Sequence, residues 1–196
     1  MTIIQYIRNF FGHLGTILKH KYYVGKYCFK AGLYLQGITH DLSKFHPVEF
    51  FESVRWYDGH ISPMDKCKKA KGYSNAWFHH RGRNKHHYEF WCDNFEKGIT
   101  CVDMPYKYAL EMLCDYIGAG RAYMGGKFSF SKEYEWWSKT KQPVAKMSDN
   151  TKQFIDSCLF SLAQLEERWP DEIDNFWKNK TYKTIWNITN KQQKNG

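Results

Sequence analysis

An ordered series of histidines and aspartates constrains this chain more than any other feature. The sequence has 9 histidines, and most of them follow one another with acidic residues at two points. In chain order the series is His20, His40-Asp41, His79-His80, His86-His87 and Asp115. Imidazole and carboxylate groups are the usual protein ligands of zinc, iron, manganese and related ions. The series therefore predicts a fold that gathers these side chains into a metal site, with enough ligands for more than one ion.

Length and composition predict one globular domain. The chain has 196 residues, of which 42% are hydrophobic and 18% aromatic, enough for a substantial core. We expect this domain over residues 1–190 and a polar tail over 191–196. The net charge of +9 favours an anionic partner, such as a nucleotide or other small phosphoester, although lysines that serve only solubility explain it equally well. The lysines form no long basic run, so nucleic acid is possible but not favoured.

Apolar periodicity predicts an all-α protein. Apolar residues recur at spacings of three and four along most of the chain, and alternating strand patterns are scarce. Polar or irregular segments are expected at 58–74, a loop or lid, and at 125–150. The expected helices cover 2–12, 15–31, the stretch after Pro47, 75–82, a stretch from Asn84 that carries His86 and His87, Pro105 to Gly118 or Gly120, and 151–168, with a shorter aromatic segment beyond Pro170.

The cysteines predict a reduced, cytoplasmic protein. The chain has 6 cysteines and no Cys-x-x-Cys pair, and several cysteines lie among apolar residues, as buried free thiols do. No segment has the pattern of a cleavable leader, and no apolar run is long enough to cross a membrane. We therefore expect free thiols and no membrane association.

The segment Thr-His-Asp-Leu-Ser-Lys places three chemically useful groups together. Adjacent His40 and Asp41 at a helix end can diverge toward two ions, or Asp41 can bridge them. Lys44 returns to the face of His40 if the turn is helical. Its charge could there hold a substrate phosphate or stabilise a developing oxyanion. A His-Asp pair alone is common by chance, and the histidines before and after it make the pattern specific.

Taken as a whole, the series resembles the HD-domain superfamily of metal-dependent phosphohydrolases. That superfamily takes a histidine from one helix, an adjacent His-Asp from the next and an aspartate from a later helix. Its two-metal branch, which resembles the cyclic-dinucleotide phosphodiesterases, adds one histidine and a His-His pair. The resemblance implies a single-domain HD-like helical bundle with two divalent transition-metal ions (Mn, Fe, Zn, Ni or Co). The implied ligands are His20, His40, Asp41, His80 (or His79), His86, His87 and Asp115, and Lys44 matches the lysine of the His-Asp-x-x-Lys motif.

The match also departs from that superfamily. Residues 10–140 resemble small uncharacterised bacterial and phage proteins with similar His-Asp-Leu-Ser-Lys-Phe-x-Pro-x-Glu-Phe and Arg-Asn-x-His-His segments. The spacing between His20 and His40 is shorter than in ordinary HD domains, and Tyr88-Glu89-Phe90-Trp91 stands where the cyclic-dinucleotide enzymes have a Gly-Tyr-Pro loop. Thr16, one turn before His20, offers no carboxylate for a third ion. Two ions are therefore expected rather than three, and cyclic di-GMP is not a privileged substrate.

Each candidate also has an ordinary explanation. His20 could be a buried helix histidine that is only hydrogen-bonded, and of His79 and His80 we expect one ligand and favour His80. Glu111, one turn before Asp115, either orients a ligand or is a plain surface residue. Surface or cap positions are expected for His13, His46 and His60. Phosphate contacts beside Lys44 are possible for Arg81, Arg83 and Arg121, although solvated arginines at helix ends are commoner.

The function that these residues predict is hydrolysis of a nucleotide or other small phosphoester. Two ions would supply hydroxide near neutral pH, Asp41 would join them, and Lys44 would neutralise charge on the phosphate. Two alternatives stay open. A di-iron pair that activates oxygen would use the same ligands, because imidazole and carboxylate suit iron as well. A non-enzymatic basic protein with a structural metal is less expected, since structural zinc sites are rich in thiolates.

Overall fold

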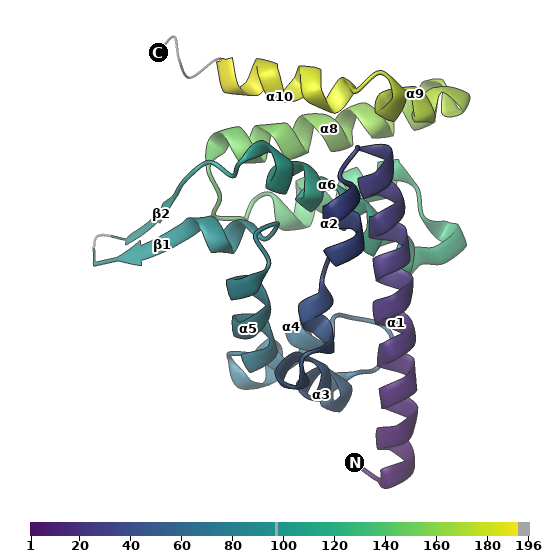
Figure 1. Ribbon diagram of the computed structural model, residues 1–196, viewed down its shortest axis with the longest axis vertical. Coiled ribbons are helices and arrows are strands. Elements are labelled where there is room, and N and C mark those ends of the chain that lie inside the picture. Colours follow the sequence, from purple (N-terminus) through teal and green to yellow (C-terminus); the bar gives the residue numbers. More distant parts are fainter. Residues whose placement is uncertain (97, 192–196) are drawn as a thin grey trace.

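The protein is helical, with one small β-hairpin (Figure 1). A computed structural model describes residues 1–96 and 98–191, and within them the predicted all-α fold is confirmed. The α-helices are α1 (Ile3–Lys30), α2 (Tyr34–Thr39), α3 (Pro47–Trp56), α4 (Pro63–Lys71), α5 (Asn75–Arg83), α6 (Tyr106–Met124), α7 (Phe130–Trp136), α8 (Asp149–Arg168), α9 (Ile173–Lys178) and α10 (Thr181–Lys191). Short 3-10 turns are η1 (Leu42–Phe45), η2 (Tyr88–Trp91), η3 (Gly125–Lys127) and η5 (Pro170–Glu172), and η4 (Trp137–Lys141) is a π-helical turn. Strands β1 (Cys92–Phe95) and β2 (Gly98–Cys101) pair antiparallel.

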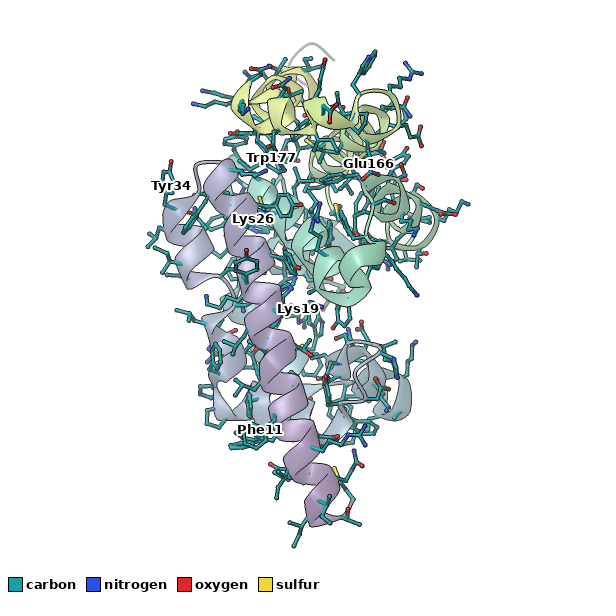
Figure 2. All side chains as sticks on the ribbon, turned by 90° about the vertical axis from the view of Figure 1, so that its right-hand side faces the viewer. Phe11, Lys19, Lys26, Tyr34, Glu166 and Trp177 are labelled. Atoms are coloured by element: carbon teal, nitrogen blue, oxygen red, sulfur yellow. A yellow bond between two sulfur atoms is a disulfide. The ribbon has the colours of Figure 1, made fainter. Side chains whose placement is uncertain are left out.

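Helix α1 connects two halves of the molecule. One half contains α3, α4 and α5, and the other contains α6, α8, α9 and α10 (Figure 1). Helix α1 has 28 residues and begins at Ile3, after the N-cap Thr2, whose side chain accepts a hydrogen bond from the Gln5 amide. Figure 2 shows it running from Phe11 in one half, past Lys19, to Lys26 in the other. At a rise of about 1.5 Å per residue, such a helix extends roughly 40 Å. One helix can therefore contribute side chains to both halves and to the region between them.

Two separate apolar clusters lie along α1. The first joins Ile17 to Phe50 and Val54 of α3. The second, larger cluster begins at Val24 and continues through α6 and α8 to the C-terminal helices. His20 lies on α1 between Ile17 and Val24, so the candidate metal ligands are placed where the two clusters meet. A buried polar centre at such a junction is held by packing on both sides.

A close contact between α1 and α6 sets the position of two candidate ligands. A Cβ added at Gly118 would lie 2.5 Å from Val24 Cγ2 and 2.8 Å from the Val24 backbone nitrogen, so only glycine fits there. His20 lies one turn before Val24, and Asp115 about one turn before Gly118. The contact therefore brings His20 and Asp115 side by side.

Several predicted boundaries are wrong. Residues 2–12 and 15–31 form one continuous helix, since Gly12 and Gly15 lie inside α1 without breaking it. The expected loop at 58–74 contains α4, and the irregular stretch at 125–150 contains α7 and the π-helical turn. Asn84 ends α5 instead of opening a helix, so the residues after it continue as η2 and β1. The predicted starts at Pro47 and Pro105 agree with α3 and α6, and the helix expected at 151–168 is α8.

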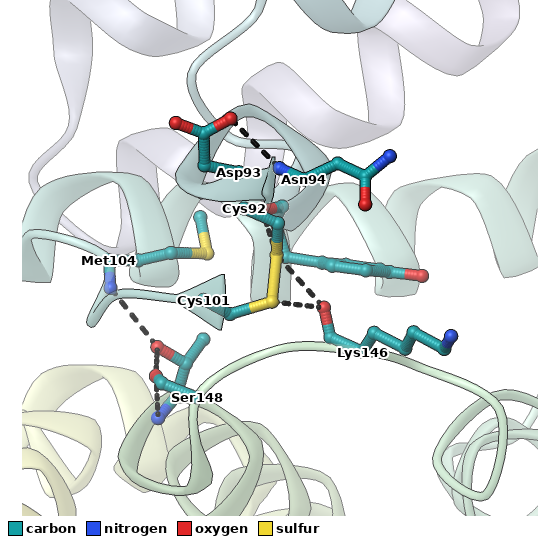
Figure 3. The surroundings of a disulfide bond; sticks show 9 residues. Cys92, Asp93, Asn94, Cys101, Met104, Lys146 and Ser148 are labelled. Atoms are coloured by element: carbon teal, nitrogen blue, oxygen red, sulfur yellow. Dashed lines mark hydrogen bonds between the residues drawn. A yellow bond between two sulfur atoms is a disulfide. The ribbon is translucent and has the colours of Figure 1, made fainter. Parts of the chain in front are cut away.

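The expectation of free thiols throughout is also wrong. Cys92 and Cys101 face each other in the register of the hairpin and form a disulfide, and both sulfurs lie 3.0 Å from the carbonyl oxygen of Lys146 (Figure 3). Their spacing in sequence gives no sign of this pairing, because only the hairpin register brings them together. The other cysteines, Cys28, Cys67, Cys114 and Cys158, are buried and free as predicted.

Two further expectations concern the chain ends and the membrane. Helix α10 includes Lys191, and the remainder of the predicted tail, 192–196, lies outside the described residues. Among the described helices, none combines the length and the apolar character that crossing a bilayer requires.

Candidate metal centre

The backbone at His40 and Asp41 turns both side chains inward. Helix α2 ends at Thr39, and Asp41 adopts a left-handed conformation with φ of 54° before η1 begins. Aspartate tolerates this region better than most residues, because its short polar side chain can bond locally. Lys21 donates to the carbonyl oxygens of Ile38 at 2.6 Å and His40 at 2.8 Å, which stabilises the end of α2. As a result His40 and Asp41 are each only 2% exposed.

Asp41 stands between two groups of histidines. Its Oδ2 lies 3.2 Å from Nε2 of His20 and 3.4 Å from Nε2 of His40. Its Oδ1 lies 3.3 Å from Nε2 of His80 and 3.3 Å from Nε2 of His86. The two oxygens of a single carboxylate thus face different imidazole groups.

The remaining predicted ligands complete these two groups. Asp115 Oδ1 lies 3.2 Å from His20 Nε2 and 3.4 Å from His40 Nε2. Ligand atoms of His20, His40, Asp41 and Asp115 lie within 4.8 Å of one another, and so do those of Asp41, His80, His86 and His87. We call these the first set and the second set. The structure therefore brings together all seven residues that the sequence series predicted as ligands.

Unpaired buried atoms in the centre fit a cation. Asp41 Oδ1, His86 Nε2 and His87 Nε2 are buried and make no hydrogen bond. Leaving such atoms without a partner costs about 1–3 kcal/mol each, and native structures rarely do so without a reason. A metal ion among these atoms would satisfy them, and imidazole and carboxylate are suitable ligands. These buried clusters of histidine and acidic residues could hold metal ions.

Two buried glutamates orient the histidines. Glu111 Oε1 lies 3.0 Å from His40 Nδ1 and 3.2 Å from His86 Nδ1. Glu49 Oε2 lies 2.7 Å from His80 Nδ1. A carboxylate that accepts the Nδ1 proton leaves the lone pair on Nε2, the atom directed at Asp41 in all three histidines. Glu111 therefore has the orienting role that its position suggested.

Glu49 is the functional residue that the sequence reasoning missed. It is fully buried, and its Oε1 also accepts from His79 Nδ1 at 2.6 Å. His79 stacks on His46 and belongs to neither set, whereas His80 belongs to the second, in line with the preference for His80. Glu49 occupies the third position of α3, where an acidic residue is usual for capping and for the helix dipole. Because capping and the helix dipole already account for a glutamate at this position, its contact with His80 could not be predicted from the sequence.

The charges of the centre are strongly coupled. Burial would lower the pKa of His40, but Asp41, Asp115 and Glu111 together raise it to about 10. Burial would raise the pKa of Asp41, yet His40, Lys44 and His80 hold it well below its usual range. For His87, burial and the neighbouring His86 and His80 lower the pKa well below its usual value, so this imidazole is neutral. A cation that binds here must displace protons from the histidines, as metal binding in general does.

Lys44 lies where the centre opens into a cavity. Its Nζ lies 2.6 Å from Asp41 Oδ2, and Asp41 raises its pKa although burial opposes this. The cavity has a volume of about 250 Å³, and its lining includes Lys44, His20, His80, His87 and Asp115. Thus Lys44, two further lysines (Lys68 and Lys141) and members of both ligand sets line the same space.

The predicted arginine contacts lie elsewhere. The lining of this cavity includes none of the three arginines. Arg121 donates to the Tyr27 hydroxyl, and its guanidinium lies over the Phe128 ring. Arg81 lies over the Phe78 ring, and Arg83 lines a separate hollow behind His40 and His86. Of the predicted phosphate contacts, Lys44 alone is placed beside the centre.

Comparison with known proteins identifies the family but no activity. A model of a family of unknown function, DUF5662, matches residues 9–160, which include every member of both ligand sets. The chain belongs to the DUF5662 family. No curated protein and no solved structure matches the chain significantly. A function for this DUF5662 protein must therefore be argued from its own site.

Proposed function

We propose that this DUF5662 protein is a metal-dependent phosphohydrolase that uses two divalent transition-metal ions. The observation that carries the proposal is the position of Asp41, whose Oδ2 faces the first set and whose Oδ1 faces the second. Each set supplies four residues when Asp41 is counted in both. Four protein ligands leave a position for water or substrate on an ion that takes five or six ligands. The HD-like resemblance of the sequence agrees with this assignment.

The chain's own residues prepare the site for this chemistry. Glu111 and Glu49 hold the Nδ1 protons of His40, His86 and His80, so Nε2 is the atom that would offer its lone pair to an ion once any proton there is displaced. All members of the two sets are buried except His87, which is half-buried, and this burial strengthens the charge interactions in the centre. Bound ions would supply an acidic water near neutral pH and would neutralise charge on phosphoryl oxygens.

Lys44 gives the site its preference for an anionic substrate. Its ammonium group pairs with Asp41 Oδ2 and also lines the cavity. A substrate in the cavity would therefore meet this charge beside both ligand sets. A phosphoryl oxygen could then accept a hydrogen bond from Lys44, and this contact would strengthen as negative charge builds up in the transition state. This contact favours an anionic substrate, so we favour phosphoester hydrolysis over oxygenation of an uncharged organic substrate.

The test compares Lys44→Met with Lys69→Met. Lys69 is an exposed lysine of α4 and serves as the control. After loading with manganese, zinc or iron, both variants should retain the metal content of the wild type. With 4-nitrophenyl phosphate and bis(4-nitrophenyl) phosphate, Lys44→Met should lose on the order of 10²-fold in turnover, the usual effect of removing one transition-state contact. The control should keep its activity.

Two results would count against this account. Full phosphatase activity of Lys44→Met would refute the contact between Lys44 and phosphate, but it would leave the hydrolase intact. Oxygen consumption with an organic substrate, with no phosphoester turnover under any of these metals, would assign the centre to the di-iron oxygenase class instead.

A further inference from the structure

The cavity beside the metal centre continues to a histidine that belongs to neither ligand set. Its lining runs from His20 and Lys44 to His13, Ser53 and Ser62, which lie on α1, α3 and the segment before α4. His13 was expected at the surface or at a helix cap, and this prediction is wrong, because the residue is 6% exposed. The far end of the cavity is therefore a built, polar part of the interior.

His13 has an unused hydrogen-bonding atom. Its Nδ1 is buried and makes no hydrogen bond. Its ring packs against Phe50 and Tyr57, with ring centres 5.4 Å and 5.8 Å away. These rings hold the imidazole in place without satisfying its polar atoms. A buried polar group in this condition is costly, and a ligand that supplies the missing partner recovers the cost.

The charge of His13 indicates which kind of group it can bind. Burial lowers its pKa, and the nearby Lys44 lowers it further, to about 4. The imidazole is therefore neutral near pH 7, with one nitrogen that donates and one that accepts. A neutral donor and acceptor suits a hydroxyl group, whereas a second phosphate would call for cations. Two further ammonium groups at the cavity wall have partners of their own. Lys68 is paired with Asp65 at 2.6 Å, and Lys141 donates to the Tyr88 hydroxyl at 3.3 Å and lies 4.0 Å from Glu89.

The distance along α1 limits the size of the ligand. His13 and His20 are two turns apart on one face of the helix, which corresponds to about 10 Å. A phosphorylated sugar has this length, and a dinucleotide is much longer. The cavity volume of about 250 Å³ agrees, because pockets for drug-sized ligands begin at roughly 300 Å³.

We propose that His13 binds a hydroxyl group on the organic part of the substrate, so that the substrates are small hydroxylated phosphomonoesters such as sugar phosphates. This inference rests on the proposed function, since it places the phosphate at the metal centre. It narrows that function by excluding dinucleotides and nucleic acid as preferred substrates. The hydroxyl would lie at the His13 end, beside Ser53 and Ser62.

The test measures discrimination between two phosphomonoesters. D-ribose 5-phosphate carries hydroxyl groups, and phenyl phosphate has none beyond the phosphate. The variants are His13→Phe, which keeps a ring but no polar atom, and His13→Gln, which keeps a donor and an acceptor. The control is His60→Phe, an exposed histidine outside this cavity. Circular dichroism and metal content establish that each variant is folded and loaded.

The quantity to compare is kcat/KM for ribose 5-phosphate divided by kcat/KM for phenyl phosphate. His13→Phe should reduce this ratio on the order of 10- to 100-fold, as expected for loss of one hydrogen bond to a buried group. His13→Gln should restore part of it, and the control should match the wild type. A binding readout is the ¹⁵N resonance of His13 Nδ1 in zinc-loaded protein, which should shift with the phosphonate analogue of ribose 5-phosphate and not with inorganic phosphate.

The outcomes separate the inference from the proposed function. Turnover of phenyl phosphate with an equal ratio in wild type and His13→Phe overturns the His13 assignment and leaves the hydrolase intact. Preference for a dinucleotide over ribose 5-phosphate overturns it as well. Absence of turnover for phenyl phosphate and all other phosphoesters overturns both.

Discussion

Replacing Glu49 should weaken one metal site and leave the other nearly intact. Glu49→Met keeps the approximate size of the side chain but removes both acceptor oxygens, which hold His79 and His80. The Nδ1 proton of His80 then loses its acceptor, and the ring can rotate its Nε2 away from Asp41. His20, His40 and Asp115 do not contact Glu49, so the first set should keep its geometry.

Two independent estimates give the same magnitude. Burial would raise the pKa of Glu49, but His80 and His79 lower it, so the lost hydrogen bond is made to a charged group. Such bonds contribute about 1.5–3 kcal/mol. Loss of a carboxylate that orients a histidine ligand typically costs about 10- to 100-fold in metal affinity, which is about 1.4–2.8 kcal/mol. We therefore expect the ion at the second set to bind about 10- to 100-fold more weakly.

The assay is zinc titration of metal-free protein against a chromophoric chelator, which resolves two binding steps. Glu52→Met is the matched control, because Glu52 lies on the same helix and accepts hydrogen bonds from Ser74 and Ala76 at the start of α5. Glu111→Met should weaken both steps, since Glu111 accepts from a histidine of each set. Wild-type affinity for both ions in Glu49→Met, or an equal loss in Glu52→Met, would refute the reasoning.

The remaining predictions concern stability. Gly118→Ala should destabilise the protein by about 1–3 kcal/mol in urea unfolding, because its Cβ would press on Val24, whereas Gly82→Ala, with open space around its Cβ, should stabilise it by about 0.5–1 kcal/mol. Burial and Asp115 raise the pKa of Glu133 to about 8. The Glu133 carboxyl therefore loses its proton at a lower pH in the unfolded chain than in the folded protein. As a result the free energy of unfolding falls as the pH rises from the ordinary glutamate range toward 8, by at most about 1.4 kcal/mol per pH unit. In chelator-treated protein Glu133→Gln should lack this loss, so the free energy of unfolding of the variant should rise relative to the wild type from pH 5 to 8. A difference that does not change with pH would contradict the raised pKa of Glu133.

The ligand series could be predicted from the sequence because its members follow one another in a specific order, although each residue alone has an ordinary explanation. Buried aspartates and histidines need polar partners. For His40, Asp41 and Asp115, the other members of the series are the obvious partners. The long amphipathic helices were predictable for the same kind of reason, since their apolar faces repeat over many turns. The structure gathers the residues that these patterns singled out.

The elements around the ligands were less predictable, because tertiary contacts override local patterns there. His86 and His87 follow the helix end at Asn84, where His80 and Ser43 hold the Asn84 side chain. Helix α4 is rich in lysine and has only a short apolar face, so composition alone indicated a loop. Glu49 was overlooked and His13 was wrongly assigned to the surface or a cap, because only the facing helices show what these two residues contact.

The central claim is that Asp41 joins two metal ions, and anomalous diffraction from crystals of zinc-loaded protein tests it most directly. The account predicts two peaks, one on each side of Asp41. The first should lie within about 2.0–2.2 Å of Asp41 Oδ2 and of ligands from His20, His40 and Asp115, and the second at the same range from Oδ1 and from His80, His86 and His87. A single peak, or none at full zinc loading, would contradict the account.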